Sequence, residues 1–315
     1  MSTPRKTKPG AVIGRNPAGV ADKAPAAAST AAITQGFWAP PELPFLEIRS
    51  TFDSLSPYAE HFHQSFSLGL ILKGRTIFTC GRREHLAEAG DLVLIEPEMV
   101  HSCNPMEGGA RSYHMLHLDP LWCLEQIETP APAFLRLPPP AQNGSEALPA
   151  VWNLNKRVLK DQSIFRQVLN FVEAVQADSF DAAPAFGRLL GRLLAGILAG
   201  FSPARESQTV LEARGLFCGD LIERRKLAEV AARLGLRRES LIRGFRRSRG
   251  LPPGAYRQCL RLLEGRRLLR RGSGIAEAAL AAGFTDQSHF HRMFVKYFSA
   301  TPRQYKMNRS LSYKK

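Results

Sequence analysis

Two sets of polar side chains in this 315-residue chain have the chemistry of functional sites. The first set, near the C-terminus, has the hydrogen-bonding side chains that read base edges in a DNA major groove: Gln287, Ser288, His289 and Arg292. The second set, in the N-terminal half, is made of histidines, whose ring nitrogens can bind a metal ion or a small ligand: His61, His63 and His101. Each set needs an element of secondary structure to position it.

The C-terminal set lies on a predicted helix over 286–298. Asp286 is a good N-cap, because its carboxylate can accept backbone N–H groups of the first turn. Phe290, Phe294 and Phe298 repeat every four residues and form one apolar stripe. The polar side chains lie off that stripe, so the helix can pack on one face and read DNA with another.

A similar pattern occurs about fifty residues upstream. A short apolar helix is predicted from Leu227, Val230, Ala231 and Leu234, and Gly235 supplies the tight turn of a helix-turn-helix. A second helix over 238–249 follows, anchored by Leu241 and Phe245. Ile275–Ala282 and Gly283 repeat the short helix and turn before the C-terminal helix. The sequence therefore predicts two helix-turn-helix units in tandem.

This tandem resembles the DNA-binding domain of the AraC/XylS family of bacterial transcription regulators over roughly a third of the chain. The second unit carries the landmarks Gly283-Phe284, Phe290, Arg292, Phe294, Thr301-Pro302 and Tyr305. The first carries Leu227-Ala228, Leu241, Arg243, Phe245, Gly250, Pro253 and Tyr256. Three positions depart from the family pattern. Arg237-Arg238 replaces a capping Ser-Pro pair, Ser299 replaces a helix-ending glycine, and Gly265 replaces alanine at a helix-propensity cost of roughly 1 kcal/mol.

The resemblance implies roles for individual residues. The base-contact candidates are Arg238, Glu239, Ile242, Arg243, Gln287, Ser288, His289 and Arg292. The phosphate-contact candidates, which would set register and affinity, are Arg246, Arg247, Lys296 and Arg303. Phe245, Phe290, Phe294 and Tyr305 are expected in the core. A helix over 253–271 would join the two recognition helices as a rod of roughly 27 Å, close to the ~34 Å between successive major grooves.

The charge is unevenly placed along the chain. The net charge is +15, and residues 214–315 carry 24 Lys/Arg against 7 Asp/Glu, a net of +17. Residues 37–213 carry 14 against 20, a net of −6. A basic module joined to a mildly acidic body is typical of a DNA-binding domain attached to a second domain.

The N-terminal part reads as a tail followed by short strands. Residues 1–36 are rich in Ala, Pro and Lys without a period, and we expect a disordered basic tail. Alternating segments at Ser67–Leu72, Arg75–Thr79 and Asp91–Ile95, separated by glycines, predict a small β-barrel or jelly roll. The segment resembles the cupin-like sensor domain of the same family, which implies a ligand-binding barrel over 37–145, with a Pro-rich loop over 131–145.

The histidines lie in this predicted barrel. His61 and His63 are two apart, so both would face one side of a strand, and His101 ends a later strand. Metal-binding cupins add a carboxylate soon after the pair, and none follows His63. We therefore expect no metal and no other cofactor, while Glu84, Glu96 and Glu98 are spare carboxylates. The candidates for lining an effector pocket are His61, His63, Phe66, Phe78, Glu96, His101, Tyr113 and His114. His117 is expected to face away from His114.

Residues 146–205 are predicted to be helices that either pack on the barrel or form a dimer contact, and 206–214 is predicted to be a linker. The fold class is thus α+β, with a cupin-like barrel and a helical DNA-binding domain at 215–310. The five cysteines form no CxxC pair, which fits a reducing cytoplasm. The most apolar run, Leu189–Phe201, contains Arg192 and is too short for a bilayer of roughly 30 Å.

The expected function is that of a cytoplasmic, nucleoid-associated transcription regulator without enzyme activity. Its expected partners are double-stranded promoter or operator DNA, a small-molecule effector, RNA polymerase at activated promoters, and a second copy of the chain, with no membrane. Three rivals stay open: a cupin oxygenase or isomerase, a repair regulator that accepts alkyl groups on cysteine, and an architectural DNA binder without an effector. The sequence names neither effector nor operator.

Overall fold

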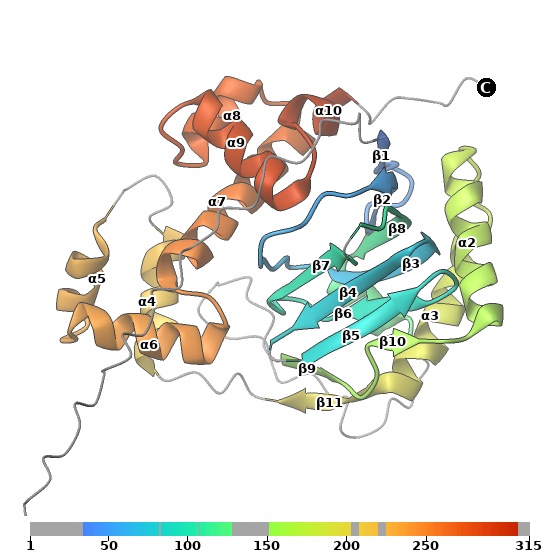
Figure 1. The fold of residues 1–315 in the computed structure, drawn as a ribbon, viewed down its shortest axis with the longest axis horizontal. Coiled ribbons are helices and arrows are strands. Elements are labelled where there is room, and N and C mark those ends of the chain that lie inside the picture. The colour runs from blue at the N-terminus through green and yellow to red at the C-terminus, as the bar shows by residue number, and fades with distance from the viewer. Residues whose placement is uncertain are drawn as a thin grey trace, which may run out of the picture. The chain divides into compact units, whose positions relative to one another are not determined.

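The computed structural model describes residues 34–81, 83–106, 108–127, 151–202, 208–219 and 225–307. The N-terminal part is built from strands with three helices, and the C-terminal part is helical, so the predicted α+β class is correct (Figure 1). The described part of the expected tail, from Thr34 onward, is already strand β1. The remainder of that tail and the loop at 131–145 lie outside the described residues.

The main sheet of the N-terminal part has six strands in the order β1-β2-β8-β3-β6-β10, and the strand pairs that compose it are antiparallel. Its strands are β1 (Thr34–Trp38), β2 (Leu46–Ser54), β3 (Phe66–Lys73), β6 (Leu92–Ile95), β8 (Arg111–Leu118) and β10 (Val158–Leu159). Ser50 of β2 pairs with His114 of β8, and Leu70 of β3 pairs with the same residue from the other side. The described segments that were predicted as strands appear at the predicted places.

A second sheet, with three strands in the order β5-β4-β7, faces the first. It consists of β4 (Arg75–Cys80), β5 (Arg83–Glu88) and β7 (His101–Pro105). Side chains from both sheets share one apolar cluster that includes Ile71, Phe78 and Tyr113. Nine of the described strands thus form two facing sheets that do not close into the expected barrel, and the other two described strands pair in a small sheet of their own. The turns between neighbouring strands use glycines with positive φ, such as Gly74 at 79° and Gly90 at 93°.

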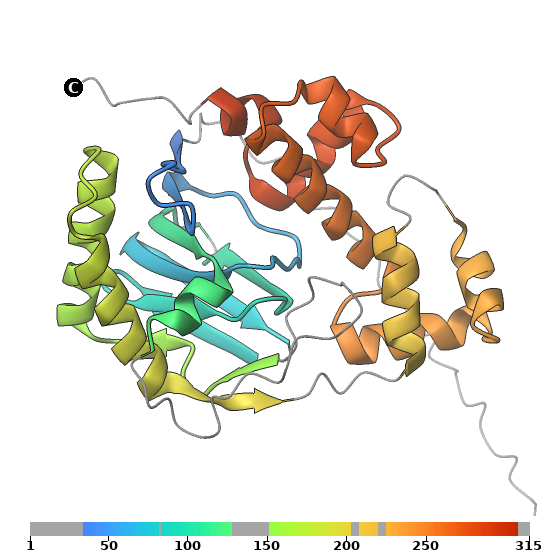
Figure 2. The same cartoon turned by 180° about the vertical axis from the view of Figure 1, so that it is seen from behind.

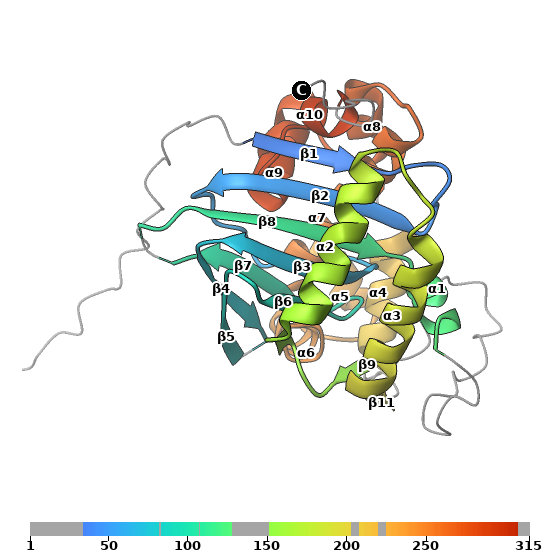
Figure 3. The ribbon, with the colours of Figure 1, turned by 90° about the vertical axis from the view of Figure 1, so that its right-hand side faces the viewer.

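The other face of the six-stranded sheet is covered by two amphipathic helices, α2 (Gln162–Gln176) and α3 (Ala183–Ile197) (Figure 3). Their buried stripes join Leu46, Leu68 and Leu116 of the sheet in one core. Packing on the sheet, one of the two predicted roles, is therefore present. Smaller elements complete this part: α1 (Pro120–Glu125), β9 (Val151–Leu154) and β11 (Leu198–Ser202).

Side chains along each strand of the six-stranded sheet alternate between its two faces. On β8, Leu116 and Leu118 point to the helix-covered core, whereas Tyr113 contributes to the cluster between the sheets. On β2, Leu46 and Ile48 belong to the helix-covered core. Odd-numbered residues of β2, β3 and β8 consequently face the space between the sheets, and this space becomes the candidate site.

The C-terminal part contains seven helices among the described residues, and in Figure 2 α7 runs between the two helix-turn-helix units. They are α4 (Gln208–Gly219), α5 (Leu227–Arg233), α6 (Arg238–Arg249), α7 (Pro253–Arg270), α8 (Ile275–Ala281), α9 (Gln287–Phe298) and α10 (Pro302–Met307). The predicted tandem is confirmed. The range expected to be a linker, 206–214, is helical from Gln208, because Val210 and Ala213 bury against the helical core.

Packing between helices explains the glycine at position 265, which helix propensity alone did not. A Cβ at this position of α7 would lie 2.7 Å from Cε2 of Phe290, so the glycine allows α9 to approach α7 closely. Ser299 ends α9 with φ of 48°, a left-handed conformation that favours glycine. No helix of the described segments is both long and apolar enough to cross a bilayer.

Candidate functional site

A cavity of about 60 Å³ lies on the inner face of the six-stranded sheet. Its polar walls come from β2 and β8, from the segment before β3, and from the start of β7. Three helices of the C-terminal part line one side, with Arg266 of α7, Phe298 of α9 and Tyr305 of α10. Its apolar lining includes Phe37, Ile71, Val93, Met115 and Phe298. A second, larger hollow of about 850 Å³ shares Glu47, His63, His117 and Arg266 with it.

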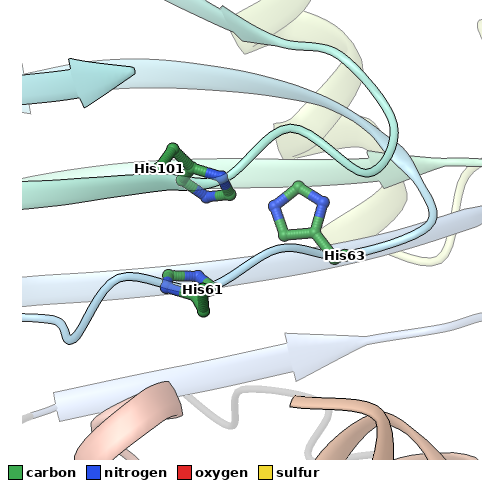
Figure 4. Close-up of side chains that lie close together, drawn as sticks. All are labelled: His61, His63 and His101. Atoms are coloured by element: carbon green, nitrogen blue, oxygen red, sulfur yellow. The ribbon is translucent and has the colours of Figure 1, made fainter. Parts of the chain in front are cut away.

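Three histidines meet at one wall of this cavity (Figure 4). The nearest ring nitrogens of His61, His63 and His101 all lie within 4.8 Å of one another. The sequence predicted that His61 and His63 lie on one strand, and this prediction is wrong. They lie in the connection before β3, where His61 forms a single antiparallel bridge with His101 at the start of β7.

Backbone carbonyls orient these rings. Nδ1 of His61 lies 2.8 Å from the carbonyl oxygen of Ala59, and Nδ1 of His101 lies 2.8 Å from that of Met99. Burial lowers the pKa of His61 to about 4 and holds the pKa values of His63 and His101 well below the ordinary histidine value. The rings are therefore neutral at pH 7, and Nε2 of His61 and His101 remains available for a ligand.

Neutral imidazoles of this kind are the groups in the described part of the chain that could hold a metal ion. The spare carboxylates do not add to them. Glu96 pairs with Arg157, Glu98 pairs with Arg214 and Arg249, and Glu84 is exposed on β5. Glu47 lines the cavity but is bonded to α7 and α10. The carboxylate missing after His63 is thus not replaced by another described residue.

Glu47 joins the two parts of the chain at the cavity. It is 3% exposed, and its carboxylate accepts hydrogen bonds from a guanidinium nitrogen of Arg266 and from the Tyr305 hydroxyl, the latter at 2.8 Å. Arg270 lies 3.5 Å from the same carboxylate. Tyr305 was expected to be a core residue, and it is buried, but its hydroxyl also forms part of the cavity wall.

Apolar and charged contacts extend this junction. Phe37 of β1 packs edge-on against Tyr305 at 5.0 Å between ring centroids, and Phe62 stacks on Tyr256 of α7 at 4.7 Å. Glu98 accepts hydrogen bonds at 2.9 Å from both Arg214 of α4 and Arg249 of α6. A molecule in the cavity would therefore touch residues that are tied directly to the helix-turn-helix domain.

Four of the eight pocket candidates from the sequence line the cavity: His61, His63, His101 and Tyr113. The other four do not. Phe66 belongs to the helix-covered core, Phe78 fills the cluster between the sheets, and Glu96 is paired with Arg157. His114 faces the helices and hydrogen-bonds with Ser50 at 2.6 Å, because it is even-numbered on β8.

The period of two identifies several lining residues that the sequence analysis missed. His117 lies three residues from His114 and so points the opposite way, into the cavity. Glu47, Arg49 and Arg111 follow the same rule on β2 and β8. Arg266 had no such signal, because only the tertiary structure brings α7 beside the sheet. Cys103 also lines the cavity, and burial raises its pKa to about 11, which disfavours the reactive thiolate.

The second candidate site is the outer surface of the two recognition helices. Helix α9 begins at the predicted cap, where the Asp286 carboxylate accepts the backbone N–H of His289 at 2.7 Å. Helix α6 begins at Arg238, and its N-cap residue Arg237 makes no side-chain cap, as the replacement of Ser-Pro predicted. Phe245, Phe290 and Phe294 are fully buried and fix both helices on α7.

The side chains proposed to touch DNA lie on α6 and α9, except Arg303, which lies on α10. Among the base-contact candidates, Ile242 and His289 are half-buried, and the exposed ones are Arg238, Glu239, Arg243, Gln287, Ser288 and Arg292. The phosphate-contact candidates Arg246, Arg247, Lys296 and Arg303 are exposed as well. Helix α7 has 18 residues, so it spans roughly 27 Å between the two units.

Comparison with known proteins agrees with both parts of the structure. The helix-turn-helix domain family matches residues 230–308, and the AraC-like ligand binding domain family matches residues 53–197. Together these matches cover more than half of the chain. The uncharacterized HTH-type transcriptional regulator YbfI of Bacillus subtilis (strain 168) is 23% identical over 246 residues, covering 75% of this chain and 82% of that protein.

Further similarity is found to a transcriptional activator and to a solved structure. The HTH-type transcriptional activator RhaS of Pectobacterium carotovorum is 26% identical, over 78% of this chain and 86% of that protein. ToxT from Vibrio cholerae, in a crystal structure with a bound unsaturated fatty acid, shares the fold with a TM-score of 0.51 at 14% identity. That likeness covers 83% of this chain and 94% of ToxT. The chain therefore belongs to the AraC/XylS family, as a DNA-binding transcriptional regulator with an N-terminal ligand-binding domain.

Proposed function

We propose that a small molecule bound in the cavity between the sheets controls how this regulator binds DNA. The observation that carries the proposal is the shared wall: sheet residues and three helices of the DNA-binding domain line the same cavity. An occupant that binds one arrangement of the two domains better than another would shift the population toward it. The ToxT structure with its bound fatty acid supports the proposal, because a protein of the same fold holds a small molecule.

Glu47 is the residue through which we expect this control to act. Its carboxylate connects β2 to both α7 and α10, and α7 is the helix that joins the two recognition helices. A ligand that alters the Glu47–Arg266 contact would change how the reading helices are held. The larger hollow beside the cavity shares both residues and gives a ligand a route to them.

On DNA, we propose that α6 and α9 enter successive major grooves on one face of the duplex. Arginine pairs with guanine, glutamine with adenine, and glutamate accepts from cytosine. These pairings assign base reading to the exposed candidates of both helices. The exposed cations behind them would neutralise phosphates.

We further propose that the protein acts in the cytoplasm on the nucleoid, as a homodimer, and contacts RNA polymerase where it activates. The name of the relative RhaS supports activation. No catalytic role is proposed for the histidines.

The test combines DNA selection with ligand screening. Full-length protein is used to select its sites from a random duplex pool, and affinity for the selected site is then measured with a panel of metabolites. We expect a bipartite site with two contacted segments about one helical turn apart, and a change of affinity with one chemical class. Binding to one short segment only would refute two-groove reading. Affinity unaffected by every compound would refute control by an effector.

A further inference from the structure

Two buried arginines on the cavity wall lack a negatively charged partner in the part of the chain that the structure describes. Arg49 of β2 is 8% exposed and Arg111 of β8 is 1% exposed, and both line the cavity. A guanidinium group keeps its charge in a protein. Burying such a charge without compensation is strongly unfavourable, so this pair requires an explanation.

The partners recorded for these two guanidinium groups are neutral. Arg49 donates to the Tyr58 hydroxyl at 2.6 Å. Arg111 donates to the Thr76 hydroxyl and to the backbone carbonyl of Ser56. Both groups lie over the Tyr58 ring, at 5.3 and 5.4 Å from its centroid. Aromatic faces stabilise a cation partly, but the Nε of each arginine still has no acceptor among the described atoms.

The other charged groups of the cavity do not compensate them. Glu47 is the single carboxylate among the described lining residues, and it is taken by Arg266 and Tyr305. The histidines from every side of the cavity are neutral. Burial lowers the pKa of His117 well below its ordinary value, and the charges of Arg266 and Arg49 lower it further. Two positive charges therefore remain on the inner wall without a counter-charge from the described residues.

We propose that the effector of this protein is an organic acid whose carboxylate binds Arg49 and Arg111. Arginine is the side chain best suited to carboxylate recognition, because its N–H groups form charge-assisted hydrogen bonds in a fixed geometry. The cavity of about 60 Å³ holds a few waters or an acid group. Phe37, Ile71, Val93 and Phe298 line it with apolar surface for the body of the acid. This inference rests on the proposed effector function and names the class of ligand.

The acid group would also accept hydrogen bonds from the Nε atoms of Arg49 and Arg111, which have no acceptor among the described atoms. A carboxylate offers about four acceptor positions, enough for the free Nε groups of both arginines. A neutral amide or alcohol of the same shape would leave the two charges uncompensated. The cavity should consequently discriminate strongly between an acid and its amide.

The experiment measures binding of matched acid and amide pairs to the full-length chain by calorimetry and thermal melting. Hexanoate with hexanamide and benzoate with benzamide are suitable probes at millimolar concentration, each with and without a chelator. We expect an acid to bind and raise the melting temperature, and its amide to bind at least roughly tenfold more weakly.

Two variants and one matched control locate the site. Arg49→Gln and Arg111→Gln should each weaken binding of the acid by roughly tenfold or more. Without ligand, Arg49→Gln should melt at the same or a higher temperature, because an uncompensated buried charge is removed. Arg75→Gln, which changes an exposed arginine of β4 outside the cavity, should alter neither property. If Arg111→Gln does not fold, Arg49→Gln still carries the test.

Several results would overturn the assignment. If amides or other neutral compounds bind and change DNA affinity while acids do not, the effector function stands and the anionic class is wrong. If acid binding disappears with chelator, the acid sits on a metal held by the histidines and not on the arginines. If Arg49→Gln lowers the melting temperature and leaves acid binding intact, the arginine has a structural role only. If neither acid binds, this inference fails, and the effector function is then decided separately by the response of DNA affinity to the metabolite panel.

Discussion

The same residue type behaves differently in the two parts of the molecule. In the sensor domain, Arg49 and Arg111 are buried on a cavity wall. On the recognition helix α6, Arg238, Arg246 and Arg247 are exposed. Exposed arginines suit a polyanion such as DNA, where many screened contacts add up and depend on salt. A buried pair suits one small anion in a fixed geometry. Burial, and not the residue type alone, thus distinguishes the proposed ligand contacts from the proposed DNA contacts.

The two recognition helices differ in a similar way. Helix α6 carries five arginines and begins without a side-chain cap, whereas α9 begins at the Asp286 cap and presents mostly neutral hydrogen-bonding groups. Helix α6 can therefore place more positive charge beside phosphates, while both helices carry candidates for base reading.

The largest change in stability should come from removing the buried carboxylate charge of Glu47, which is paired with Arg266. Glu47→Gln leaves Arg266 beside the cavity without its carboxylate, and we expect a loss of about 3 kcal/mol in the free energy of unfolding. Denaturant unfolding measures it. The matched control is Glu264→Gln on α7, whose partner Arg267 is exposed, and it should cost about 1 kcal/mol or less. Equal losses in both variants would contradict the contrast between buried and exposed pairs.

Acid should weaken the sensor domain through its buried histidines. The pKa of His114 is about 4 in the folded state because of burial, below the value of about 6.5 for an unfolded chain. The unfolded state then binds more protons between pH 6.5 and 4, so stability falls as the pH is lowered through that window. The contribution is about 3 kcal/mol.

The variant His114→Asn keeps a polar side chain beside Ser50 but removes the titrating group. Unfolding free energies of both proteins, measured across this pH range, should therefore diverge, with the variant losing less stability on acidification. Parallel profiles would show that His114 is already protonated in the native protein.

Exposed arginines should affect DNA binding without affecting stability. Arg292→Ala should cost about 1–3 kcal/mol of binding to the selected site and relax specificity at one base position. Arg246→Ala should weaken binding to all sequences alike and reduce the salt dependence by about one charge. Competition binding over a salt series compares the two. If Arg292→Ala weakens binding equally for all DNA sequences, Arg292 contacts a phosphate and not a base.

The smallest effect tests close packing in the DNA-binding domain. Propensity alone predicts that Gly265→Ala stabilises α7 by roughly 1 kcal/mol. A Cβ there would meet the Phe290 ring at 2.7 and 2.9 Å, so we expect a destabilisation of about 1–2 kcal/mol. The control Gly244→Ala on α6, where a Cβ meets nothing within 4 Å, should stabilise instead. Stabilisation by both changes would show that α9 can shift away from α7 and make room for the added Cβ at little cost.

The helical domain was largely predictable because its signals are local. Asp286, Gly235 and the phenylalanines of α9 act within a turn or two, and the structure places the helices at the predicted residues. The helix propensity argument failed at Gly265, where a contact with another helix decides. The candidate cavity was half predicted, because the alternation along β8 was recognised but His114 was chosen in place of His117.

The sequence by itself determined the two helix-turn-helix units, the family, the separation of charge between the domains, and which strand positions share a face. These follow from caps, turns and periods that neighbouring residues set. Only the tertiary structure decided that two sheets face each other and that Glu47 meets Arg266 and Tyr305. It also decided that Arg49 and Arg111 are buried without a counter-charge from the described residues. Those contacts join residues far apart along the chain, so their energies depend on packing that no local pattern contains.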